Sequence, residues 1–121
     1  MNIAATPLLH EDRIDRLRLI RSENIGPVTY RQLIARYETA TRALHALPEM
    51  ARRGGRKRSL RIAAKSVAER EMAAVAALGG RHLFLGEPDY PVPLANIPDA
   101  PPALTLLGRG EILAKPAIGI V

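Results

Sequence analysis

The sequence predicts an α+β fold in which an all-α domain is followed by the beginning of an α/β unit. Through the first 78 residues, apolar side chains recur three and four positions apart, which is the spacing of a helix face. Seven of the ten prolines lie between residues 86 and 116, where they exclude long helices and leave room for short strands. Residues 117–121 form a continuous apolar run typical of a strand inside a parallel sheet.

Two helices joined by a tight turn are expected at the start of the chain. Apolar residues at three-residue steps, namely Ile14, Leu17 and Ile20, predict a helix that ends near Ser22. The Asn-Ile-Gly-Pro sequence at residues 24–27 then breaks the helix, because glycine accommodates a tight turn and proline suits a first helical turn. A second helix therefore begins near Pro27, and we expect its apolar stripe to face the core: Tyr30, Leu33, Ile34 and Tyr37.

A third, shorter helix is expected after Thr39, a residue suited to cap a helix start. Its inner side carries four apolar residues, Ala40, Ala43, Leu44 and Leu47. Pro48 is then expected to open a separate turn, which Gly54 and Gly55 end.

A fourth helix is predicted from the Ser-Val-Ala-Glu sequence at residues 66–69, which matches a capping box. This helix is expected to run to about Leu78, where Gly79 and Gly80 provide a left-handed stop. Short strands are then expected at residues 81–85, 103–108 and 117–121. Because no element follows the last strand, the α/β unit is expected to be incomplete.

The positive charge of the chain is concentrated in one segment. Lysine and arginine number 18 against 12 acidic residues, a net charge of +6. Residues 52–65 contain no acidic residue and seven basic ones: Arg52, Arg53, Arg56, Lys57, Arg58, Arg61 and Lys65. The remainder is therefore 11 minus 12, or −1. Such a patch can bind phosphates and release their counterions, although a solvated loop would have the same composition.

Several classes of protein are excluded by counting. The absence of cysteine excludes disulfides, thiolate nucleophiles, cysteine-bearing zinc sites and iron–sulfur clusters. The longest purely apolar run, residues 72–78, is far shorter than the roughly 18 residues of a membrane-spanning helix. Residues 1–9 also lack the basic start of a signal peptide. We therefore expect a soluble, cytoplasmic protein that does not bind membranes.

No catalytic constellation is found, so we expect no enzyme, no cofactor and no metal. Three histidines, His10, His45 and His82, are far apart and are expected to be solvated or structural. Glu87 and Asp89 lie in a proline-rich loop, where acidic residues usually form turns and caps. Phosphate loops of the Walker and dinucleotide types are absent. Of the four aromatic residues, only Tyr90 is expected to be free to stack on a base, and the equal alternative is that it anchors its own loop.

Residues 17–37 resemble a helix-hairpin-helix unit. In that motif, a glycine-containing turn exposes backbone N–H groups that hold a phosphate without reading base sequence. Asn24 occupies the place of the usual first glycine, and Gly26 that of the second. Gly26 and Thr29 are therefore candidate phosphate contacts, and the alternative is an ordinary helical hairpin packed for stability.

The carboxyl-terminal half resembles the DNA-processing protein A family, DprA or Smf. The resemblance rests on Gly-Glu-Pro-Asp-Tyr-Pro-Val-Pro-Leu at 86–94, Ile-Pro-Asp-Ala-Pro-Pro-Ala-Leu at 97–104 and Leu-Gly-Arg-Gly at 107–110. Residues 13–27 and 47–55 are similar to the family's helical domain. The resemblance implies a SAM-like helical domain at 1–53, a basic connector at 54–65 and, at 66–121, an extended Rossmann domain that stops before its Gly-Ser-Arg loop.

The resemblance also implies a function. Members of the family bind single-stranded DNA during natural transformation and load a RecA-type recombinase onto it without catalysing a reaction, and the full-length protein forms a homodimer. The candidate DNA-binding residues are the seven basic residues of 52–65 together with Gly26 and Thr29. The alternative is a helical protein-interaction module that does not bind DNA itself.

Overall fold

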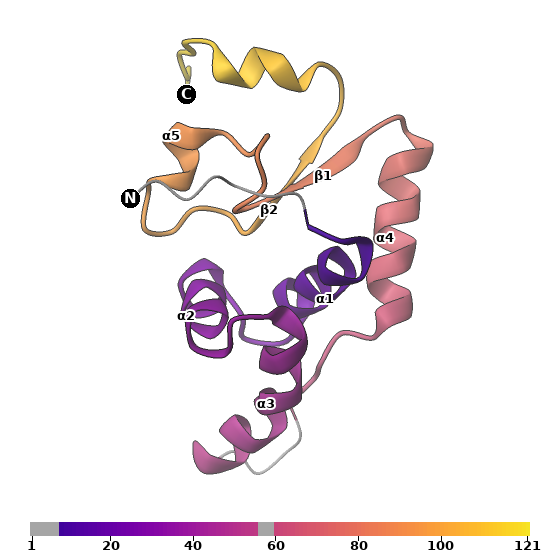
Figure 1. Ribbon diagram of the computed structural model, residues 1–121, viewed down its shortest axis with the longest axis vertical. Coiled ribbons are helices and arrows are strands. Elements are labelled where there is room, and N and C mark those ends of the chain that lie inside the picture. Colours follow the sequence, from indigo (N-terminus) through magenta and orange to yellow (C-terminus); the bar gives the residue numbers. More distant parts are fainter. Residues whose placement is uncertain (1–7, 56–59) are drawn as a thin grey trace.

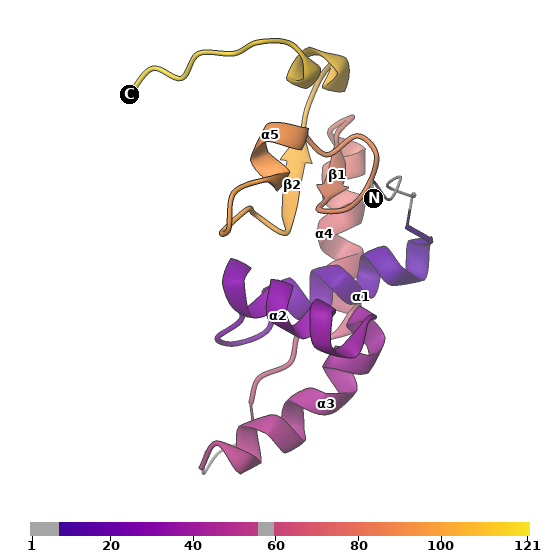
Figure 2. The ribbon, with the colours of Figure 1, turned by 60° about the vertical axis from the view of Figure 1, so that its left-hand side comes forward.

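Five helices, a short 3₁₀ helix and two strands make up the part of the chain that this computed structural model describes, residues 8–55 and 60–121. In chain order they are α1 (His10–Arg21), α2 (Pro27–Tyr37), α3 (Ala40–Arg53), α4 (Lys65–Ala77), β1 (Arg81–Phe84), α5 (Val92–Ala95), β2 (Ala103–Leu106) and η1 (Gly110–Ala114). Helices α1, α2 and α3 gather at one end of the molecule and the strands at the other, while α4 runs beside both (Figures 1 and 2).

The two strands form a small antiparallel sheet, in which Arg81 lies opposite Leu106 and Phe84 opposite Ala103. Together with the helices, this sheet confirms the α+β class. The parallel pairing that a Rossmann unit requires is not found among the described residues.

The strand expected at residues 117–121 is wrong. This segment pairs with no strand within the described residues, and its side chains are exposed, Ile118 by 92% and Ile120 by 93%. An apolar run becomes a strand only when a neighbour satisfies its backbone groups, and neither β1 nor β2 does so here. The second strand also ends earlier than expected, at Leu106, and Gly108 then adopts a left-handed φ of 100°.

The capping box expected at residues 66–69 is also wrong. Helix α4 begins at Lys65, its N-cap is Ala64, and no side chain bonds the cap. The start of the helix is determined instead by tertiary contacts: Ala63 donates its N–H to Ser22 Oγ at 3.0 Å and accepts from Arg18 Nε at 3.0 Å. Because these bonds keep the preceding backbone extended, the helix begins without a local cap.

Helix α3 is longer than expected, because Pro48 lies inside it rather than opening a separate turn. The expected cap is confirmed, since Thr39 Oγ1 accepts from the N–H of Arg42 at 3.2 Å. Proline removes one helical hydrogen bond, yet apolar contacts continue on both sides of it. Leu44 and Leu47 are buried before it, and Met50 packs on the same core after it.

Helix α1 contributes to both apolar clusters of the fold. The first cluster joins α1, α2 and α3 and comprises Leu19, Tyr30, Leu33, Ala40, Ala43, Leu44 and Leu47. The second joins α1 to α4 and β1 and comprises Ile14, Leu17, Ala68 and Phe84. The core stripe predicted for α2 is confirmed at Tyr30 and Leu33, whereas Tyr37 is only half-buried.

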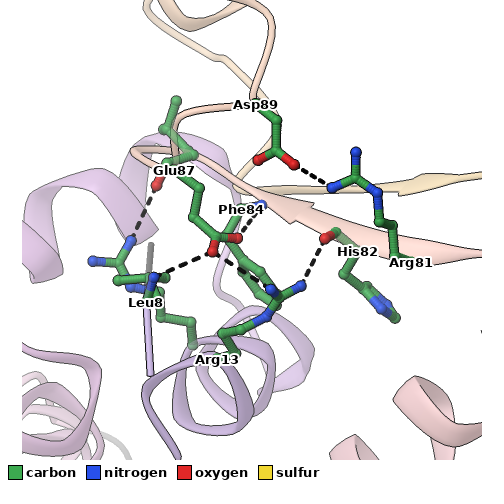
Figure 3. Close-up of polar contacts among 9 residues, drawn as sticks. Leu8, Arg13, Arg81, His82, Phe84, Glu87 and Asp89 are labelled. Carbon is green, nitrogen blue, oxygen red and sulfur yellow. Dashed lines mark hydrogen bonds and ion pairs between the residues drawn. The ribbon is translucent and has the colours of Figure 1, made fainter. Parts of the chain in front are cut away.

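A buried carboxylate connects α1 to the loop after β1 (Figure 3). Glu87 is only 6% exposed, and its Oε2 accepts from Leu8 N–H at 3.2 Å and from Arg13 Nη1 at 3.4 Å. Its other oxygen accepts from Phe84 N–H at 3.2 Å. Arg13 also donates to the carbonyl of His82 at 2.7 Å and lies over the Phe84 ring. The prediction that Glu87 and Asp89 lie in turns is confirmed, since Glu87 N–H donates to the carbonyl of Phe84 at 3.0 Å and Tyr90 N–H to that of Glu87 at 3.2 Å. Asp89 pairs with Arg81 of β1.

A second polar junction connects α1 to α4. Arg21 binds Glu71 through Nε at 2.8 Å and Nη2 at 3.0 Å. The same carboxylate lies 2.8 Å from Nε2 of His82, whose side chain is buried. The hydrogen bond from Arg21, aided by His82, lowers the pKa of Glu71 below its ordinary value of 4.5, against the opposing effect of burial.

Replacing Glu87 with alanine should lower the free energy of unfolding by about 2 to 4 kcal/mol, because it leaves one buried and two partly buried donors without their acceptor. Urea unfolding measures this change. Asp89→Ala is the matched control in the same loop, and it should cost less than about 1 kcal/mol because its pair with Arg81 is exposed. Equal losses for the two variants would contradict the account.

The lowered pKa of Glu71 gives a stability contribution with a defined pH dependence. A carboxyl group with a depressed folded-state pKa stabilises the fold above its unfolded pKa, and the contribution is lost as the pH falls through the folded value. Wild type should therefore exceed Glu71→Gln in unfolding free energy at pH 7, and the difference should shrink towards pH 3. A difference that is constant with pH would contradict this assignment.

Candidate nucleic-acid interface

The basic segment at residues 52–65 begins at the end of α3, which lies far from the strands (Figure 1). Arg52 and Arg53 are in the last turn of α3, and both are exposed. Three of the predicted contacts, Arg56, Lys57 and Arg58, lie outside the described residues. Their participation stays a prediction.

The later part of the segment packs on the helical domain. Leu60 and Ile62 contact the first apolar cluster. The backbone of Arg61 exchanges two bonds with Glu23: its carbonyl accepts from Glu23 N–H at 2.9 Å, and its N–H donates to Glu23 Oε2 at 3.0 Å. The backbone at this position is thus fixed, while the Arg61 side chain is exposed.

Carboxylates from outside the segment lie against its basic residues. Glu49 pairs with Arg52 and, at 3.3 Å, with Arg53, and Glu11 lies 3.3 Å from Lys65. The carboxylate of Glu23 also accepts from the backbone N–H of Arg61, so three acidic residues lie beside described residues of the segment. Exposed ion pairs of this kind contribute only about 0 to 1 kcal/mol, so a phosphate can replace the carboxylate.

Lys65 is separated from the other basic residues. It occupies the first position of α4 and pairs with Glu11 of α1. The start of α4 and the end of α3 lie apart in both views of the ribbon (Figures 1 and 2). The structure therefore separates Lys65 from Arg52 and Arg53 at the end of α3.

The helix-hairpin-helix turn differs in detail from the sequence expectation. Pro27 is confirmed as a first-turn residue of α2, and Gly26 is its N-cap with an extended backbone, φ −90°. The left-handed residue of the turn is Asn24, with φ 63°. Asparagine tolerates this conformation better than most residues, which is why it can stand where the motif usually has glycine.

The turn and the end of α3 border one cavity of about 250 Å³. Its lining is mostly apolar and comprises Glu23, Asn24, Ile25, Thr29, Leu33, Leu47, Met50, Ala51 and Leu60. Thr29 thus lies across the cavity from α3. Because the carboxylate of Glu23 lines the same cavity, it opposes an anion beside Thr29.

The structure places Arg53, a predicted contact, beside Arg36, which sequence reasoning missed. Arg36 of α2 and Arg53 of α3 line one surface depression, although 17 positions separate them in the chain. A charge count along the sequence has no means of pairing them. Only the packing of α2 on α3 brings them together.

Within residues 8–55 and 60–121, no group of three or more histidine, cysteine, aspartate or glutamate residues is placed to hold a metal. In the same residues, no helix combines the length and apolar character needed to cross a membrane. His82 is a structural histidine, as expected, whereas His10 and His45 are exposed.

Comparison with protein-family models identifies the helical part. The model of the DprA-like N-terminal HHH domain matches residues 10–74, which is 65 of the 121 residues. Comparison with curated proteins found no match. The matched stretch begins at the start of α1 and extends into α4, so it includes the helix-hairpin-helix turn and the basic segment. The chain therefore belongs to the DprA family, whose amino-terminal HHH domain it carries.

Proposed function

We propose that this protein is a non-catalytic DNA-processing protein that binds single-stranded DNA without sequence preference. The observation that carries the proposal is the concentration of seven basic residues at 52–65, inside a domain whose family suggests a role in DNA processing. The strand would lie along the end of α3, where Arg52 and Arg53 are exposed, and continue to Arg61. Its phosphates would replace the weakly held carboxylates there.

The wider role follows the family. The protein acts in the cytoplasm during natural transformation, delivers the bound strand to a RecA-type recombinase and forms a homodimer. In these roles, the end of α3 contributes only the binding of single-stranded DNA. No membrane contact belongs to the proposal.

A second candidate function is the docking of a protein partner by the helical domain. The observation that favours it is the apolar cavity of about 250 Å³ between the turn and α3. A buried apolar side chain in such a cavity is a common anchor of protein interfaces. Ala51→Phe would fill this cavity and should weaken binding to a RecA-type recombinase while leaving binding of single-stranded DNA unchanged. Unchanged binding of both ligands would count against this candidate.

The affinity for an oligo(dT) of 30 nucleotides should fall steeply as the salt concentration rises. Four to seven phosphate contacts predict a slope of log K against log salt of about −3 to −5, since each contact on a single strand contributes about 0.7. Fluorescence anisotropy between low and physiological salt measures it. Arg56→Ala, Lys57→Ala and Arg58→Ala combined should reduce the slope by about 2.

Arg109→Ala is the control for loss of a positive charge, because Arg109 is exposed and paired with Glu111 on the strand side of the molecule. Its slope should equal that of wild type. Absence of binding at low salt would contradict the proposal, and so would an equal reduction of the salt slope in Arg109→Ala.

Glu49→Gln should strengthen binding of the same oligonucleotide about 2- to 5-fold at low salt, because it removes the carboxylate that competes for Arg52 and Arg53. Glu111→Gln is the matched control, an exposed glutamate paired with an arginine elsewhere, and should change nothing. If Glu49→Gln binds no better than wild type, Arg52 and Arg53 do not contact the strand.

A further inference from the structure

A second surface depression, of about 400 Å³, lies between the end of α2 and the second half of α3. It is lined by Arg36, Tyr37, Ala46, Glu49, Met50 and Arg53. The two helices lie side by side in both views of the ribbon (Figures 1 and 2). None of the sequence motifs considered above contains this group of residues.

Tyr37 is the aromatic residue of this chain that remains available at the surface. The structure describes all four aromatic residues, and Tyr30, Phe84 and Tyr90 are buried. Of the two expectations for Tyr90, the free ring is wrong and the anchor is confirmed: Tyr90 is 4% exposed, and its hydroxyl donates to the carbonyl of Pro101 at 2.7 Å. Tyr37 is half-buried, so part of its ring packs on the helical core while another part borders the depression.

The side chains around Tyr37 are suited to bind a flat aromatic ring such as a nucleobase. The guanidinium of Arg36 lies 5.3 Å from the centre of the Tyr37 ring, which is the distance of a cation–π contact. Nucleobases stack on both tyrosine rings and arginine planes, and each stacked base typically contributes about 1 to 3 kcal/mol. Ala46 and Met50 supply an apolar wall beside this pair.

The depression is continuous with the basic end of α3. Ala46, Met50 and Arg53 are four and then three residues apart, so they lie on one face of the helix. Arg53 therefore borders the depression and also belongs to the basic segment. A strand whose phosphates contact Arg52 and Arg53 would place a neighbouring base beside Tyr37.

We propose that this depression is a nucleobase-stacking subsite for single-stranded DNA, with Tyr37 and Arg36 as the stacking pair. The inference rests on the proposed function for its phosphate contacts. It adds a contribution of the bases, which the basic segment alone does not provide. An acidic peptide would use the arginines but gain nothing from the ring, so the aromatic contribution distinguishes the two ligands.

The test compares two oligonucleotides of equal length, oligo(dT) and its abasic analogue, which has the same phosphates without bases. The full chain should bind oligo(dT) about 5- to 20-fold more tightly than the abasic strand. Tyr37→Leu, which keeps an apolar side chain against the core, should abolish this preference and leave abasic binding unchanged. Tyr37→Phe should retain the preference, because it keeps the ring.

Intrinsic fluorescence gives a second readout, since the chain has three tyrosines and no tryptophan. Oligo(dT) should quench the emission of wild type more than the abasic strand does, and Tyr37→Leu should lose this difference. Equal affinity of wild type for the two strands, or a preference that persists in Tyr37→Leu, would overturn the subsite alone. Failure of both strands to bind would overturn the proposed function with it, and equally tight binding of poly-glutamate would assign the surface to an acidic peptide.

Discussion

The arrangement of the two halves of this chain depends on the ion pair between the partly buried Arg13 and the buried carboxylate of Glu87. A buried carboxylate is unfavourable unless its oxygens are satisfied, and Glu87 meets this demand with donors from three places in the chain. Such a pair adds little net stability compared with apolar packing, but few other arrangements satisfy it. Here it determines how α1 lies against β1, and α1 carries residues of both apolar clusters.

The arginines fall into two groups that differ in their acceptors and burial, although a count of net charge treats them alike. Arg13, Arg16, Arg18 and Arg21 of α1 all bind acceptors that lie far away in the chain or on neighbouring helices. Arg13, Arg16 and Arg18 are partly buried, so a phosphate could not recruit them without leaving their acceptors unpaired, whereas the pair of Arg21 with Glu71 is exposed. Within residues 8–55 and 60–121, Arg52 and Arg53 are paired only with Glu49 in exposed ion pairs, so a competing anion displaces little. Burial, rather than charge, thus separates the arginines that are held by the fold from those that are accessible to a ligand.

Local patterns predict the elements whose causes are local. The apolar stripe of α3, Pro27 at the first turn of α2 and the Thr39 cap are confirmed, and the stripe of α2 is confirmed at Tyr30 and Leu33. The failures have distant causes: the start of α4 depends on bonds from Ala63 to α1, and residues 117–121 lack a strand partner. The two glycines after α4 show both kinds of cause. Gly79 has the expected left-handed φ of 78°, whereas a Cβ on Gly80 would lie 2.7 Å from the Leu106 carbonyl.

The candidate site also has a part that the sequence predicts and a part that only the fold reveals. A window along the sequence finds the basic run and the neighbouring Glu49, but it cannot include Glu23 and Glu11, which lie beside the run only in the folded chain. Nor can it pair Tyr37 with Arg53 across two helices. Met50 lines both depressions that flank α3, so its substitution would disturb them together. Ala51 and Tyr37 each border one of them, and these two positions therefore separate the docking of a protein partner from the stacking of a base.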